Sequence, residues 1–249
     1  MRNFILSLTL LISLSTFAQD NKGRVAFGLK YSYKPDFNQE LNESGLFMNK
    51  FKVHKSDIGL FANYGIYKSL SGQTEAGLSL YDASLYIYPE NKLSQYNSEG
   101  ISNKNVYIAQ EFACEVYSVP VSAINARIAI SPFLRFYYSM NTNNKSIERG
   151  WHDLDDDYTQ IWIEKNNLPA ISATYKLPSG YFSITPGINI DVTFNQKFGL
   201  NIFGGYDFGL AGHTKVDATY RWGTIKRDLS FKSKDSGLYF GAAIKYYLK

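Results

Sequence analysis

KFGLNIFGGYDFGL, residues 197–210, is the segment that decides the fold class. Apolar side chains stand at alternate positions, and the positions between them hold mostly glycine and polar residues. A period of two predicts a β-strand whose two faces meet different surroundings. One face carries Phe198, Leu200, Ile202, Gly204, Tyr206, Phe208 and Leu210, and the other carries Gly199, Asn201, Phe203, Gly205, Asp207 and Gly209.

The same alternation recurs along the chain and predicts eight strands in all. Two of these strands are less regular. Asp82 interrupts the apolar face of one strand, which predicts a β-bulge there. In another strand, the polar residue Gln110 occupies a position on the apolar face. The predicted strands cover residues 24–33, 56–68, 74–88, 105–119, 125–138, 181–195, 197–210 and 237–248.

The connections between these strands alternate between long and short. A transmembrane barrel has short periplasmic turns at one end, long external loops at the other, and both termini on the periplasmic side. The fold class that we expect is therefore all-β, an antiparallel up-and-down transmembrane β-barrel of eight strands. The long connections are 34–55, 89–104, 139–180 and 211–236, and the short ones are 69–73, 120–124 and a turn near Gln196.

Ten strands are the alternative count. Residues 159–165 (TQIWIEK) and 171–177 (ISATYKL) can form one more hairpin, joined through Asn167 and Pro169. Both segments are shorter than the 9–11 residues that a spanning strand needs. We therefore expect this hairpin to extend above the membrane as part of a loop.

The N-terminus reads MRNFILSLTLLISLSTFAQD, with one cation at Arg2, an apolar stretch over 4–14, and small residues at Thr16 and Ala18. This pattern predicts a Sec signal peptide over 1–18, a barrel domain over 19–249, and export to the outer membrane of a Gram-negative cell envelope. The apolar stretch is too short for a spanning helix, and the mean hydropathy of −0.25 excludes a helical membrane bundle.

Charge and cysteine content exclude further classes. Removal of residues 1–18 takes away one of the 26 basic residues, Arg2, and none of the 22 acidic ones, so the formal charge becomes +3. Nucleic-acid binding needs cations clustered on one face, and no nucleic-acid partner is expected. The single cysteine, Cys114, excludes an intramolecular disulfide and a cysteine-based metal site.

The less apolar face of the strands fits the narrow lumen of an eight-stranded barrel, because small residues dominate it. The charged residues on that face have to pair, since an isolated charge removed from water is costly. On the apolar face, Tyr31, Tyr33, Tyr138 and Tyr246 lie near strand ends, which is typical of an aromatic girdle at a membrane interface. The predicted lumen charges are Arg24, Lys30, Asp57, Glu75, Glu111, Glu115, Arg127, Arg135, Asp191, Asp207 and Lys245.

Three features carry a resemblance to a known group: a leader that ends in FAQ, the segment FGLNIFGGYDFGL, and the terminal strand GLYFGAAIKYYLK. Together they resemble the small porin-like or OmpA-like outer-membrane β-barrels common in Bacteroidota, over essentially the whole mature chain. The resemblance implies that the barrel-insertion machinery reads the aromatic residues of the last strand. Lys249 departs from the terminal aromatic residue of many such proteins.

No motif in the sequence predicts a catalytic, cofactor-binding or metal-binding residue. The carboxylates of 153–157 (DLDDD) lack the spacing of a calcium loop, so a solvated acidic loop is expected. His54 and Ser56 resemble the His-x-Ser pair of barrel enzymes that remove acyl chains from lipid A. Asp57 points to the other face and cannot orient the histidine, so no enzyme is predicted.

The sequence favours a monomeric barrel with a structural or surface-interaction role and no catalysis. Its expected partners are outer-membrane lipids, the barrel-insertion machinery, and an unidentified external ligand or protein that binds the loops. A narrow passive channel for small solutes is the first alternative, although aqueous pores need about 16 strands. A lipid-modifying enzyme is the second. The contents of the lumen distinguish these three.

Overall fold

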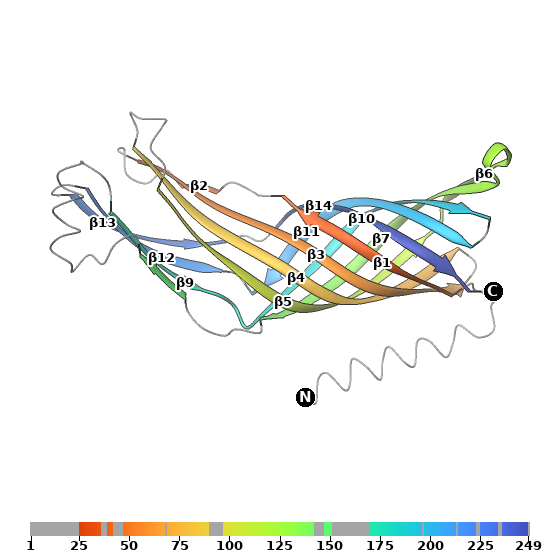
Figure 1. The fold of residues 1–249 in the computed structure, drawn as a ribbon, viewed down its shortest axis with the longest axis horizontal. Coiled ribbons are helices and arrows are strands. Elements are labelled where there is room, and N and C mark those ends of the chain that lie inside the picture. The colour runs from red at the N-terminus through yellow and green to blue at the C-terminus, as the bar shows by residue number, and fades with distance from the viewer. Residues whose placement is uncertain are drawn as a thin grey trace.

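The computed structural model consists almost entirely of antiparallel strands that wind around a common axis (Figure 1). No helix in the part of the chain that the structure describes is long and apolar enough to cross a membrane. The described residues are 25–35, 39–41, 47–67, 69–89, 97–141, 147–150, 170–195, 197–212, 214–222, 225–233 and 236–248.

Eight strands close into a barrel, as predicted. The closure is made by β1, because Ala26 pairs with Tyr247 on the last strand and with Asn63 on β3. Each neighbouring pair around the circle is antiparallel. The barrel strands are β1 (Ala26–Lys34), β3 (Phe47–Tyr67), β4 (Leu70–Pro89), β5 (Asn97–Cys114), β7 (Ala126–Asn141), β10 (Gly180–Phe194), β11 (Phe198–Ala211) and β14 (Gly237–Tyr247).

The two ends of the barrel differ as the connection lengths predicted. The end at which β14 finishes, near the C-terminus in Figure 1, carries the two short connections, from Tyr67 to Leu70 and from Phe194 to Phe198. The opposite end carries the long connections, and we call it the external end. The strands in these connections are β2 (Gln39–Leu41), β8 (Ile147–Gly150), β9 (Ala170–Lys176), β12 (Lys215–Trp222) and β13 (Ile225–Lys232).

Four of the external strands form a second sheet, in the order β13-β12-β9-β8. We call it the external sheet. Tyr175 of β9 pairs with Val216 of β12, and both side chains are fully buried. The segment 170–176 thus lies outside the barrel, and the ten-stranded alternative is not formed. The predicted partner of this segment is wrong: β9 pairs with β12 and β8, and 159–165 lies outside the described residues.

The bulge predicted at Asp82 is also wrong. Asp82 pairs with His54 within a register of β4 with β3 that is unbroken from Phe47 to Gly65. The side chain needs no bulge, because it faces outward and makes an ion pair with His54. An irregularity occurs instead in the predicted strand 105–119. The observed strand β5 ends at Cys114, before the end of the predicted strand.

After β5 the chain continues as β6 (Tyr117–Val121) along the same edge of β7, followed by the 3₁₀ turn η2 (Ser122–Ile124). Ala113 pairs with Phe133 and Tyr117 with Ile130, so residues 114–116 lie opposite 131–132. One extra residue is the arrangement of a β-bulge. The inward and outward positions are therefore exchanged beyond Cys114.

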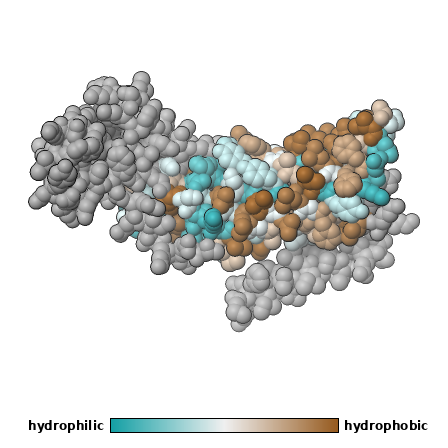
Figure 2. Space-filling view, in the orientation of Figure 1, coloured by the Kyte–Doolittle hydropathy of each residue, from teal (hydrophilic) through white to brown (hydrophobic). Residues whose placement is uncertain are grey.

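The outward face of the barrel is apolar on all eight strands, and Figure 2 shows apolar residues over the visible face of the described part of the barrel. The predicted girdle residues Tyr31, Tyr138 and Tyr246 are exposed on the outward face. Exposed apolar residues on the barrel strands include Phe27, Leu29, Ile58, Leu60, Leu78, Leu80, Val106, Leu134, Ile188, Ile190, Leu200, Ile202, Phe208, Leu210, Leu238, Phe240 and Ile244.

Glycines on the inward face make room for aromatic rings. Gly28 pairs with Phe61 across β1 and β3, and a β-carbon at Gly28 would collide with the Phe61 ring. Gly187 stands in the same relation to Phe133. Because glycine lacks a β-carbon, a large ring can lie over the neighbouring strand inside a narrow barrel.

Candidate functional site

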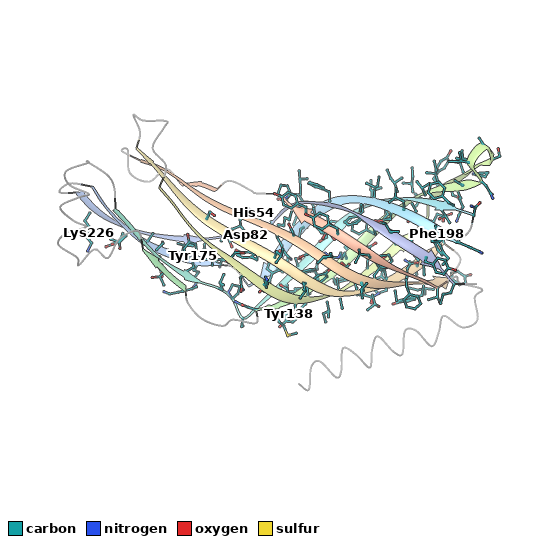
Figure 3. The ribbon with its side chains drawn as sticks, viewed as in Figure 1. His54, Asp82, Tyr138, Tyr175, Phe198 and Lys226 are labelled. Atoms are coloured by element: carbon teal, nitrogen blue, oxygen red, sulfur yellow. The ribbon has the colours of Figure 1, made fainter. Side chains whose placement is uncertain are left out.

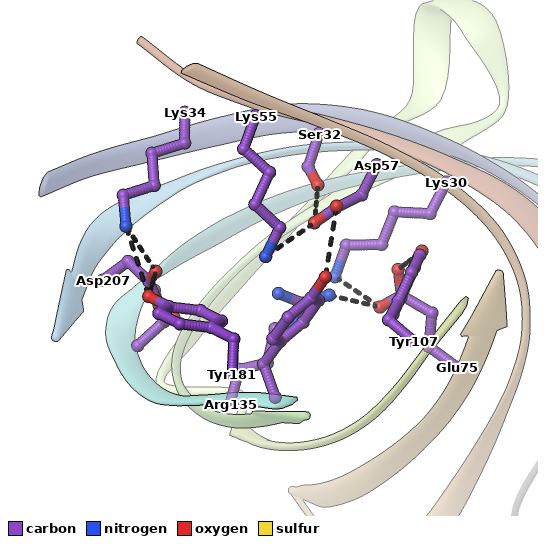
Figure 4. Close-up of polar contacts among 12 residues, drawn as sticks. Lys30, Ser32, Lys34, Lys55, Asp57, Glu75, Tyr107, Arg135, Tyr181 and Asp207 are labelled. Atoms are coloured by element: carbon purple, nitrogen blue, oxygen red, sulfur yellow. Dashed lines mark hydrogen bonds and ion pairs between the residues drawn. The ribbon is translucent and has the colours of Figure 1, made fainter. Parts of the chain in front are cut away.

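Charged side chains from six barrel strands meet inside the lumen (Figure 4). Each occupies an inward position of its strand, and all of them are buried. Four are basic and four are acidic, so the set carries no formal net charge. We call this set the lumen cluster: Lys30 and Lys34 of β1, Lys55 and Asp57 of β3, Glu75 of β4, Glu111 of β5, Arg135 of β7 and Asp207 of β11.

Glu75 is the most highly connected carboxylate of the cluster. Its Oε2 lies 3.3 Å from Arg135 Nη2 and 3.4 Å from Lys30 Nζ. Its Oε1 accepts a hydrogen bond of 2.5 Å from the Tyr107 hydroxyl. Glu75 and Arg135 are only 2% and 1% exposed. Two cations and one hydroxyl thus compensate the loss of water around a fully buried carboxylate.

Lys30 also connects Glu75 to Glu111. Its Nζ donates to Glu111 Oε2 at 2.9 Å and lies 4.3 Å from the centre of the Phe203 ring. The other oxygen of Glu111 accepts a hydrogen bond of 2.8 Å from Asn189 Nδ2. Contacts from β1, β4, β5, β10 and β11 therefore converge on one ammonium and its two carboxylates.

Asp207 makes a second centre nearer the external end. Lys34 Nζ donates to its Oδ2 at 3.0 Å, and the Tyr181 hydroxyl donates to the same oxygen at 2.9 Å. Thr185 Oγ1 donates to Oδ1 at 2.6 Å. Both oxygens of this buried carboxylate are thereby satisfied.

Asp57 lies between the two centres. The Tyr137 hydroxyl donates to its Oδ1 at 3.3 Å, and Ser32 Oγ donates to its Oδ2 at 3.4 Å. Lys55 Nζ is 3.9 Å from the same Oδ2. The Lys55 ammonium lies instead over the Tyr137 ring, 3.4 Å from its centre.

Aromatic rings fill the space between the charges. Tyr107 and Tyr137 stack with their centres 5.1 Å apart. The Arg135 guanidinium lies 4.8 Å from the Tyr137 ring centre and 4.9 Å from that of Tyr239. Cations over ring faces gain electrostatic attraction where water is excluded. The lumen cluster is therefore packed with protein atoms at the middle of the barrel.

A cavity lies on each side of the cluster. The external one is lined by residues that include Lys34, Lys55 and Tyr181. The lining of the one toward the opposite end includes Glu111 and Lys245. In the second cavity Lys245 pairs with Asp191.

Most predicted lumen charges face inward, but two do not belong to a buried cluster. Arg127 and Glu115 pair with each other, and their side chains are 54% and 30% exposed. They lie at the mouth of the barrel opposite the external end, next to the bulge at 114–116, so this part of the prediction is wrong. Arg24 lies outside the described residues. The predicted residues found on the inward face are Lys30, Asp57, Glu75, Glu111, Arg135, Asp191, Asp207 and Lys245.

Sequence reasoning missed Lys34 and Lys55. The predicted strands ended at Tyr33 and began at Ser56, so each stopped one residue before its lysine, whereas β1 ends at Lys34 and β3 already begins at Phe47. The signal was present, because Lys34 continues the inward series of Lys30 and Ser32. Extending the alternation by one residue at each external strand end would have found both lysines.

His54 and Ser56 lie on the outward face of β3, and Figure 3 shows His54 beside Asp82 of the neighbouring strand β4. The orienting acid that the sequence did not reveal is present, since Asp82 Oδ2 lies 3.2 Å from His54 Nε2. Ser56 Oγ accepts a hydrogen bond of 3.5 Å from the Tyr31 hydroxyl. Among the contacts of the described residues, none joins His54 to Ser56, so the structure does not assemble a nucleophile and its base.

The remaining candidate residues of the sequence, and one carboxylate of the external sheet, lie away from the lumen cluster. The acidic segment 153–157 lies outside the described residues. Within the described ranges, no group of side chains is suited to hold a metal ion. Cys114 is free and exposed. On the external sheet, Lys176 and Ser230 donate hydrogen bonds to Asp217 and hold the pKa of that carboxyl below its usual value.

Comparison with known proteins gives similarity of structure only. No protein-family model and no curated protein matches the sequence. The outer membrane protein OprG from Pseudomonas aeruginosa is 11% identical, with a TM-score of 0.49 over 91% of this chain and 96% of its own. A major outer membrane protein from Thermus thermophilus is 8% identical, with a TM-score of 0.41 over 92% and 100%. At such identities the likenesses say nothing about which residues bind or react.

Proposed function

We propose that the protein is an outer-membrane barrel with a structural or surface-interaction role, whose lumen is closed by the lumen cluster. The observation that carries this proposal is the packing of Arg135, Glu75, Lys30 and three tyrosine rings across the middle of the barrel. A closed lumen leaves the external end as the part that meets other molecules. That end carries the external sheet and the long connections.

The membrane location is supported by the two faces of the strands. Exposed apolar side chains cover all eight strands, whereas the charged side chains of the barrel lie mainly inside. A barrel satisfies all backbone hydrogen bonds between its strands, so it can lie in hydrocarbon without unpaired groups. The sequence resemblance to the small barrels of Bacteroidota and the predicted signal peptide over 1–18 belong to this proposal.

Cell fractionation tests the location. We expect the mature chain, beginning after Ala18, in the outer-membrane fraction, with a band that migrates faster on gels before boiling than after it. A closed barrel resists unfolding by detergent until it is heated. Recovery in the soluble periplasmic fraction would contradict the proposal, and an unprocessed N-terminus would contradict the signal peptide.

A lipid-modifying enzyme is the second candidate, favoured by the His54–Asp82 pair. The absence of a contact between His54 and Ser56 among the described residues argues against it. We expect lipid A from cells that express the wild-type protein and from cells that express Ser56→Ala to give the same mass spectrum. Loss of an acyl chain that depends on Ser56 would replace the non-catalytic proposal with the enzyme.

A further inference from the structure

The external cavity has the lining of a binding site for a small molecule, because polar and apolar side chains of several strands face it together. Uncharged polar side chains, among them Tyr81, Asn103, Asn105 and Ser139, line its wall. Leu177 and Pro178 add apolar surface. The cavity therefore offers polar contacts and a place for a short hydrocarbon chain.

The charged groups that face this cavity all have the same sign. Of the described residues that line it, only Lys34 and Lys55 are charged, and both come from inward positions of β1 and β3. Their carboxylate partners, Asp207 and Asp57, do not line the cavity. Figure 4 shows the two lysines side by side, with their carboxylates at the tips of the ammonium groups. The cavity thus borders the positive ends of two ion pairs.

The two lysines differ in how far their hydrogen bonds are satisfied. Lys34 donates to Asp207 at 3.0 Å and to the Tyr181 hydroxyl at 3.3 Å. Lys55 is 3.9 Å from Asp57, which is beyond hydrogen-bond distance, and the described residues give it no closer acceptor. An ammonium has three N–H donors. Lys55 therefore has donors available although its side chain is only 10% exposed.

The charge balance indicates which anion suits the site. The lumen cluster is neutral as a whole, and Lys34 is already neutralised by Asp207. A bound anion adds its own charge to this neutral set: a ligand with one negative charge adds one buried charge, whereas a dianion adds two, so the monoanion is the less costly ligand. The rings of Tyr137 and Tyr181, 3.4 Å and 4.8 Å from Lys55 Nζ, hold the ammonium in place before a ligand arrives.

We propose that the external cavity binds a small organic monocarboxylate, with its carboxylate on Lys55 and its carbon chain toward Leu177 and Pro178. Lys34 adds positive potential beside the same group. This site is reached from the external side of the lumen cluster, so it does not depend on whether the barrel conducts. It is distinct from the membrane-facing surface and from the His54–Asp82 pair.

Calorimetric titration of the refolded barrel in detergent tests the site, with pentanoate as the probe and pentanamide as its neutral analogue. We expect saturable binding of pentanoate, at least tenfold weaker binding of pentanamide and of inorganic phosphate, and at least tenfold weaker binding of pentanoate to Lys55→Met. Lys55→Arg should retain binding, because it keeps the charge and the donors. Lys176→Met, which removes an exposed lysine of the external sheet, should bind as the wild type does.

A measurement on the unaltered protein covers the case in which Lys55→Met fails to fold. Pentanoate should slow the reductive methylation of Lys55 in the wild-type barrel severalfold, as read by mass spectrometry, and should leave Lys176 unaffected. The proposal is overturned if the wild type binds no pentanoate, if pentanamide or phosphate binds as tightly, or if Lys55 is not protected. Unchanged binding to a folded Lys55→Met barrel would overturn it as well.

Discussion

Arg135 and Arg127 lie eight residues apart on β7 and have the same inward parity, yet their surroundings differ. Arg135 is 1% exposed and pairs with Glu75, whereas the side chain of Arg127 is 54% exposed and pairs with Glu115 at the mouth of the barrel. Buried and exposed ion pairs differ in what remains when one partner is lost. A carboxylate left alone in the lumen cannot be hydrated, and one left at the mouth can.

The pair of arginines gives the first prediction. Arg135→Met should lower the free energy of unfolding by about 3–5 kcal/mol, because Glu75 then keeps only Lys30 as a cation. Arg127→Met should cost roughly 0–1 kcal/mol, because its partner is open to water and salt. The measurement is the urea midpoint of the barrel refolded in detergent. Equal midpoints for the two variants would mean that the lumen is hydrated and that the lumen cluster does not close it.

Single residues also show where sequence reasoning reached its limit. The inward position of Glu75 or Asp207 follows from alternation alone, because parity decides the face of a strand. The partner of each charge does not follow from it, since Lys30 and Glu111 are 81 residues apart and meet across the lumen. Asp82 was misread for the same reason: the residue that explains it, His54, lies on another strand.

At the scale of the elements, Gly212 separates the barrel from the external sheet. Its φ of +84° lies in the region that favours glycine, and it stands between β11 and β12. A β-carbon there would collide with the backbone of Gly180. This kink directs the chain out of the barrel and into the second sheet.

Gly212→Ala should therefore loosen the external sheet while the barrel stays folded, with a local cost of about 1–3 kcal/mol. Gly204→Ala on β11 is the matched control, because a β-carbon there would have its nearest neighbour at 3.9 Å. Hydrogen exchange read on β12 and β14 checks this. Slow exchange of β12 in Gly212→Ala, equal to that in the control, would show that the kink does not depend on glycine.

The elements of the barrel could be predicted because each strand repeats its pattern many times between two fixed environments. The external sheet could not. Its strands are continuations of barrel strands beyond a kink, so no turn signal marks where the barrel ends. The pattern of 170–176 predicts a strand, but its partner β12 is more than 35 residues away along the chain. Alternation within one strand does not identify the strand with which it pairs.

For the molecule as a whole, the positions of the two ends predict what a reagent outside the cell can reach. In a background without the natural cysteine, Cys114→Ser, we expect Lys226→Cys on β13 to react with a membrane-impermeant maleimide on intact cells. Ser122→Cys in η2, at the opposite end, should react only after lysis. Both positions are exposed. The reverse labelling would mean that the barrel is inserted with its long connections in the periplasm.

The central claim concerns the middle of the barrel, where charges and rings of the lumen cluster occupy the space that a pore would need. Single-channel recording in planar bilayers tests it most directly. The refolded barrel, shown to be inserted by its heat-modifiable band in the same lipid, is predicted to give no discrete conductance steps in concentrated potassium chloride. Stable ohmic steps from the wild-type protein, rising with salt concentration, would contradict a closed lumen and would establish the narrow channel instead.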